Sequence, residues 1–117
     1  MINKQEFAIY SSDRNLKENI QEADFNKKIA ASNVLIREFN FKDDPNKGKV
    51  YGIIAQELEE QGLNDIVYLK EDGHKAVDYT SLMMLKIAYL ENENRVVRNE
   101  IGHLIKRISK LENNQNK

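Results

Sequence analysis

The chain contains no cysteine and only one proline among its 117 residues. The lack of cysteine excludes disulfide-stapled scaffolds, thiolate zinc sites and thiol nucleophiles. An excess of basic charge is also lacking, because 18 Lys and Arg stand against 19 Asp and Glu and leave a net charge of -1. A protein that neutralises a phosphate backbone needs such an excess, so we expect no binding to nucleic acid.

Long hydrophobic runs are missing as well. A membrane-spanning helix needs about 18 or more consecutive apolar residues, and no such run occurs in the sequence. The first ten residues, MINKQEFAIY, lack the charged-then-apolar order of a signal peptide. We therefore expect a soluble protein that has no membrane partner.

Histidine is scarce too. The two histidines are His74, in an EDGH turn, and His103, and neither has partners at metal-ligand spacing. We expect no metal, no other cofactor and no small-molecule ligand. The hydrophobic content of 40% can fill the core of one modest domain, so a deep enzyme cleft in a lone monomer is not expected either.

What is present predicts an α+β fold. Apolar, β-branched and aromatic runs predict short strands at residues 5–10, 34–42, 50–54, 66–69 and 75–79. The Asp72-Gly73 pair favours a hairpin between the last two. Helical spacing predicts two short pieces within residues 16–32, broken near 24–26, and a short helix over 55–61 that Gly62 closes.

The last third of the chain carries a seven-residue repeat. The repeat places eight residues at core positions, here called the seam: Ile87, Leu90, Asn94, Val97, Ile101, Leu104, Ile108 and Leu111. In a parallel arrangement three pairs across neighbouring chains have opposite charges: Lys86 with Glu91, Glu93 with Arg98, and Arg107 with Glu112. The seam predicts a long C-terminal helix in a parallel coiled coil between chains. An ordinary amphipathic helix is the alternative.

The seam leaves the number of strands open. Ile at the a positions with Leu at the d positions, and a buried Asn94, favour a dimer. Val97 at a d position and the apolar Ile105 at an e position widen the apolar face, which favours a higher order. The pattern alone is therefore compatible with two or three strands.

The residues with the strongest chemical potential are Ser12 and Lys17, in the group SDRNLK. A serine hydroxyl becomes a nucleophile when a base takes its proton, and a lysine can be that base when burial lowers its pKa. A turn and the start of a helix can bring Lys17 over Ser12. Attack by Ser12 on the carbonyl of Ser11 would cut the Ser11–Ser12 bond once. In the alternative interpretation Ser12 caps a helix and Lys17 is a solvated surface charge.

The order of segments resembles a known family. SSDRNLKENI, REFNFK, GIIAQE and KAVDYTSL, followed by a coiled coil, are similar to the intramolecular chaperone auto-processing domain that closes phage endosialidases, tailspikes and tail fibres. The resemblance implies a homotrimer that holds an upstream fibre or spike polypeptide in register while it folds. It also implies a single-turnover serine endopeptidase with Ser12 as nucleophile, Lys17 as base and a cut between Ser11 and Ser12.

These expectations divide the chain into three parts. Residues 1–11 would be an upstream segment left by cleavage, residues 12–79 the globular chaperone part, and residues 80–117 the coiled-coil helix. The resemblance implies a place in the virion tail or in the host cytoplasm during phage assembly. The alternative function is a trimerisation or adaptor module of a phage particle that does not cleave.

Overall fold

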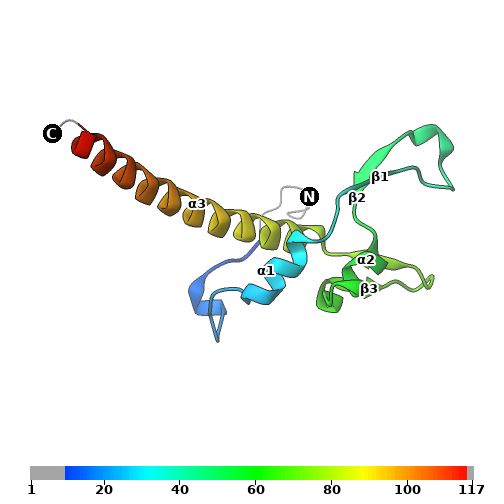
Figure 1. Cartoon of the computed structure of the whole chain (residues 1–117). Coiled ribbons are helices and arrows are strands. Elements are labelled where there is room, and N and C mark those ends of the chain that lie inside the picture. The colour runs from blue at the N-terminus through cyan, green and yellow to red at the C-terminus, as the bar shows by residue number, and fades with distance from the viewer. Residues whose placement is uncertain (1–9, 116–117) are drawn as a thin grey trace.

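The computed structural model describes residues 10–115, which form an elongated molecule (Figure 1). Its principal extents are 75 × 43 × 31 Å and its radius of gyration is 21.5 Å. A compact domain of this length has a radius of gyration of about 13 Å. The difference comes from helix α3, Tyr79–Gln115, whose C-terminal part projects alone away from the rest of the chain. The strand expected at residues 5–10 lies outside the described residues, apart from Tyr10.

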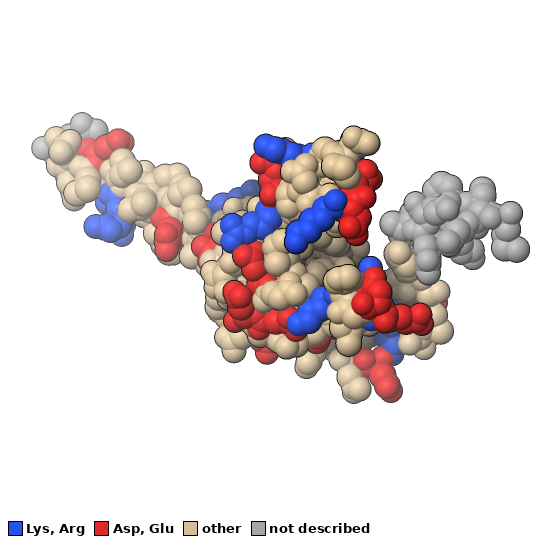
Figure 2. Space-filling view, turned by 90° about the vertical axis from the view of Figure 1, so that its right-hand side faces the viewer, with Lys and Arg blue, Asp and Glu red and all other residues tan. Residues whose placement is uncertain are grey.

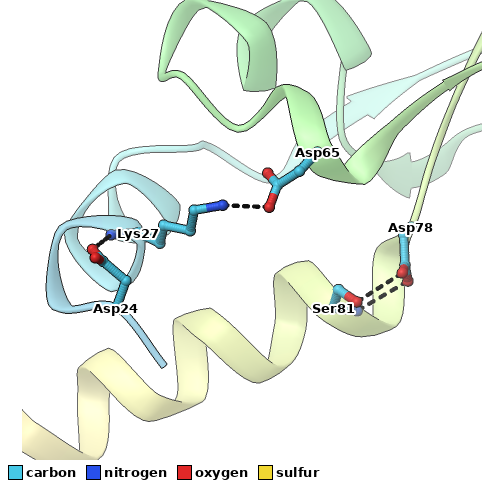
Figure 3. A network of polar contacts seen from close by, with 5 residues as sticks. All are labelled: Asp24, Lys27, Asp65, Asp78 and Ser81. Atoms are coloured by element: carbon cyan, nitrogen blue, oxygen red, sulfur yellow. Dashed lines mark hydrogen bonds and ion pairs between the residues drawn. The ribbon is translucent and has the colours of Figure 1, made fainter. Parts of the chain in front are cut away.

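The N-terminal part is less helical than its sequence predicts. It holds a 3₁₀ turn, η2, at Arg14–Leu16 and helix α1 at Phe25–Ser32. The expected helical piece before residue 24 is therefore wrong beyond that turn. Its apolar residues Leu16 and Ile20 are 72% and 63% exposed, and a helix of this length forms only when a packed face stabilises it. The expected break is confirmed, because the Asp24 side chain accepts from the backbone N–H of Lys27 and begins α1 (Figure 3).

The strands form two separate antiparallel pairs. Strand β1, Arg37–Phe39, pairs with β2, Val50–Gly52, and strand β3, Val67–Leu69, pairs with β4, Lys75–Val77. Figure 1 shows the β1–β2 hairpin reaching outward as an arm. The hairpin predicted around Asp72-Gly73 is confirmed, with Leu69 opposite Lys75.

The predicted short helix is present as α2, Ala55–Glu60, and it lies between the two strand pairs in the chain. The backbone turns beyond it at Gly62, which has a φ of 78°. That left-handed conformation suits glycine and explains how the helix ends there.

The core sits where α1, α2 and the first turns of α3 meet. Its buried members are Ala31, Val34, Ile53, Leu58, Leu63, Ile66 and Leu82. Val34 explains why the first strand begins later than residue 34: its side chain is buried in this core, and the strand starts three residues on. The core is small, and Leu58, Leu63 and Leu82 are its largest fully buried side chains.

Polar contacts fix the elements around this core. The start of α3 is capped by Asp78, whose carboxylate accepts from the Ser81 backbone N–H at 3.0 Å and from its hydroxyl at 2.7 Å (Figure 3). These hydrogen bonds hold the pKa of Asp78 below its usual range, with the Ser81 hydroxyl as the largest cause. An ion pair between Lys27 and Asp65 joins α1 to the segment before β3.

Charge is mixed over the globular end of the molecule. Figure 2 shows Lys and Arg side chains interspersed with Asp and Glu on the face it presents. In the described part of the chain, no helix is long and apolar enough to cross a membrane.

Candidate functional site

The structure brings Ser12 and Lys17 together. The Lys17 ammonium donates from Nζ to Ser12 Oγ over 2.8 Å. The two residues flank the turn η2, and both are exposed in the single chain. Oγ is thus in contact with the side chain that the sequence predicts as its base, and in this arrangement that side chain donates the hydrogen bond.

The turn between these two residues is capped by Asp13 and not by Ser12. The Asp13 carboxylate accepts from the backbone N–H of Asn15 at 2.9 Å, and its backbone carbonyl accepts from Leu16 at 3.1 Å. The interpretation of Ser12 as a helix cap is therefore wrong. Its hydroxyl contacts Lys17 instead, because Asp13 already fills the cap position.

The segment that carries this pair is tied to α1 by one buried charge. Lys28, on α1, is only 4% exposed, and its Nζ donates to the carboxylate of Glu22 at 2.9 Å. This hydrogen bond, followed by the charge of Lys28, holds the pKa of Glu22 below its usual range. Since α1 packs on α3, the segment that carries Ser12 and Lys17 is connected to α3 through the contact between Glu22 and Lys28.

One face of helix α3 packs on the rest of the domain, and the seam lies uncovered on another face. The residue buried against α1 is Leu82, with Leu85 packed at its side, and these occupy c and f positions on the outer face of the heptad. The seam residues remain uncovered, with exposures from 47% at Val97 to 62% at Leu111. Folding of the single chain therefore leaves the apolar stripe without a partner.

The charged positions beside the seam are free of one another within the chain. Among the described residues, no ion pair joins two side chains of α3. Lys86 is the exception to the expected pattern, because its ammonium donates to the carbonyl of Val34 just beyond α1. Burial at this contact lowers the pKa of Lys86. Its pairing with Glu91 would require Lys86 to leave this carbonyl.

Gly52, in the GIIAQE segment, has a structural role. The Tyr79 hydroxyl accepts from the backbone N–H of Ile53 at 3.2 Å and lies against Gly52. A Cβ at position 52 would stand 2.7 Å from that hydroxyl oxygen and 3.0 Å from the ring of Phe39. A larger residue would therefore force the Tyr79 hydroxyl or the Phe39 ring to move where the β2 backbone meets the start of α3.

Glu57, of the same segment, holds the arm in place. Arg37 of β1 makes two hydrogen bonds to it, Nε to Oε1 at 3.0 Å and the terminal nitrogen to Oε2 at 2.7 Å. The Arg37 hydrogen bond lowers the pKa of Glu57. This paired fork fixes the base of the β1–β2 hairpin to α2.

The two histidines lie on different elements of the fold. His74 lies in the hairpin turn beside Asp72, and His103 lies exposed on α3. Within residues 10–115, no three His, Asp or Glu side chains gather closely enough to hold a metal ion.

Part of the chain matches a known protein family. Residues 12–68 match the sequence model of the family described as chaperone of endosialidase. The match begins at Ser12 and includes Lys17, α1, both strands of the arm and α2. No curated protein matches the chain.

Three features of the site were missed from sequence. Burial of Lys28 had no signal, because a lysine on a short helix is usually solvated. The contact of Lys86 with Val34 joins residues 52 positions apart and depends on how α1 packs. The cap by Asp13 could have been found, since Asp ranks with Ser at this position and the turn starts directly after it.

Proposed function

Because the chain carries a domain of the chaperone of endosialidase family, we propose that it is a C-terminal chaperone of a phage fibre or spike, acting as a homotrimer. The observation that carries this proposal is the open seam on α3. A helix that packs its outer face on its own domain and leaves an apolar stripe uncovered is suited to association with further copies. Three chains joined at their C-terminal ends would hold three upstream polypeptides close together.

This tether addresses a physical difficulty of fibre assembly. Interlocked β-structures form through non-local contacts, so the entropic cost of loop closure arises before those contacts can stabilise the structure. Joining the chains raises their effective concentration and reduces that entropy. Once the fibre has formed, its unfolding barrier keeps it intact, and the chaperone becomes dispensable.

We further propose that the domain releases itself by cutting the Ser11–Ser12 bond. Ser12 Oγ attacks the carbonyl carbon of Ser11 while its proton passes to Lys17 Nζ. The C–N bond then breaks, the Ser12 nitrogen takes a proton and becomes an amine, and Ser11 is held as an ester on Oγ. Water hydrolyses the ester, which leaves a carboxylate on Ser11 and a new N-terminus at Ser12.

Association would control this step. In the single chain Lys17 is exposed and donates its hydrogen to Ser12, which is opposite to the direction a base requires. Covering by a neighbouring chain would remove water and favour the neutral amine, because desolvation disfavours the charged form. Leu16 and Ile20, both exposed beside the pair, offer the apolar surface for such a cover.

The exposure of Lys17 in the single chain favours a second candidate function, a trimerisation or adaptor module that does not cleave. A solvated Lys17 ammonium that is hydrogen-bonded to Ser12 is also expected of a surface pair without catalytic activity. The two functions share the seam and differ in whether Ser12 reacts.

Mass spectrometry of the chain with a natural upstream segment separates them. We expect a fragment that starts at Ser12, and we expect Ser12→Ala and Lys17→Arg to abolish it, since arginine keeps the charge but does not give up its proton. Ser11→Ala is the matched control, because it removes a neighbouring hydroxyl and leaves the nucleophile. An intact wild-type trimer would support the adaptor.

A further inference from the structure

We infer that Asp13 is a positioning residue for self-cleavage, which acts by capping the turn that brings Lys17 onto Ser12. The inference rests on the proposed function, since it assigns a role within the same reaction. Asp13 itself does not contact Ser12 Oγ. Its part is to fix the path of the four residues that separate nucleophile and base.

Three backbone N–H groups of the turn are hydrogen-bonded, two of them to Asp13. The Asp13 side chain holds the N–H of Asn15, its carbonyl holds the N–H of Leu16, and the Arg14 carbonyl holds the N–H of Lys17 at 3.1 Å. Asp13 has an extended backbone with φ -69° and ψ 132°, as an N-cap requires. Lys17 is extended again, so its side chain leaves the turn at its last hydrogen bond.

Among the described residues, this turn has no packed side chain to support its backbone hydrogen bonds. It spans three residues, and none of them is buried. A 3₁₀ turn of this length has weak internal geometry and forms mainly where a cap or packing fixes it. The Asp13 carboxylate makes the one side-chain hydrogen bond to its backbone. The fraction of chains in which Lys17 reaches Ser12 therefore depends on this cap.

A direct effect of the Asp13 charge on Lys17 is the competing explanation. A carboxylate close to an ammonium favours the charged form of the amine and would oppose its use as a base. The structure shows no ion pair between Asp13 and Lys17 among its described residues, and the carboxylate is instead turned to the N–H of Asn15. The geometry thus favours capping over charge.

Three substitutions separate capping from charge. Asp13→Ala removes both, whereas Asp13→Asn and Asp13→Ser keep a capping oxygen and remove the charge. Glu18→Ala is the matched control, because it removes an exposed carboxylate next to Lys17 that takes part in no hydrogen bond among the described residues. All variants are made in the full chain with its upstream segment.

The measurement is the first-order rate of appearance of the fragment that starts at Ser12, as a function of pH, on trimers verified by sedimentation. We expect Asp13→Ala to cut roughly 2- to 30-fold more slowly, which corresponds to the usual loss of an N-cap. Asp13→Asn, Asp13→Ser and Glu18→Ala should cut within about twofold of the wild type, with an unchanged pH profile.

Two results with the Asp13 variants overturn the inference while the proposed cleavage stands. Asp13→Ala that cuts at the wild-type rate shows that the cap is dispensable. Asp13→Asn that is as slow as Asp13→Ala, or that shifts the pH profile, shows that charge matters instead. A wild-type trimer that stays intact overturns the proposed cleavage and this inference with it, so the two failures are distinguishable.

Discussion

Two aspartates placed in the seam should separate the chains and stop cleavage. Ile101 and Leu104 are adjacent core layers that lie outside the hydrophobic core of the domain, so Ile101→Asp with Leu104→Asp leaves that domain intact. Each of these side chains is about half exposed in the single chain, 49% and 51%. Covering the exposed half of such a side chain contributes about 1 kcal/mol.

The loss is large when it is counted over the assembly. Two layers in three chains amount to about 6 kcal/mol per trimer, and bringing the new carboxylates to one axis adds a further penalty. The trimerisation constant should therefore fall by more than about 10⁴-fold. At micromolar concentration we expect the variant to sediment as a single chain and to show no fragment starting at Ser12.

The matched control adds the same charge on the opposite side of α3. Asn99 and His103 occupy outer f and c positions, and Asn99→Asp with His103→Asp should remain trimeric and self-cleaving. Efficient cutting by the seam variant as a monomer would refute the coupling of cleavage to association. A wild-type chain that remains single at micromolar concentration would refute the seam itself.

Three further predictions concern the domain and its caps. Leu82→Ala should lower the free energy of unfolding by about 2–5 kcal/mol in urea titrations, because Leu82 is fully buried between α1 and α3; an unchanged midpoint would contradict the assigned core. Gly52→Ala should cost about 1–3 kcal/mol by the same measurement, since its Cβ meets the Tyr79 hydroxyl, and the further change Tyr79→Phe should restore part of the loss. The lowered pKa values of Asp78 and Glu22 contribute stability above the unfolded-state pKa, so the melting temperature should fall as pH drops below about 4; Asp78→Asn should flatten this dependence, and a slope equal to the wild type would argue against the cap.

Sequence reasoning succeeded where local chemistry decides the structure. The hairpin at Asp72-Gly73 and the end of α2 at Gly62 are each determined by residues within one turn of the feature. The long helix predicted over residues 80–117 follows from a repeat within its own segment, although it begins at Tyr79, which was expected to end a strand. The contact between Ser12 and Lys17 belongs to the same class, because only four residues, which form one turn, separate them. Their part in catalysis remains a prediction.

The sequence was a poorer guide where packing decides. Leu16 and Ile20 have helical spacing, but the chain offers no surface to cover them, and the helix does not form there. The burial of Lys28 likewise depends on how α1 meets α3 and on the carboxylate of Glu22, six residues before it. Whether neighbouring copies cover these positions is a property of the assembly, and a single-chain pattern gives little information about it.

The packing of Leu82 against α1 sets how the domain is oriented around its helix. Because the domain packs on the outer face of α3, a seam that faces the trimer axis places the domain on the outside of the coiled coil. In the proposed trimer the three β1–β2 arms would then radiate about 120° apart at one height along the axis. The spacing of the incoming fibre chains would be set by the helix, and not by the arms themselves.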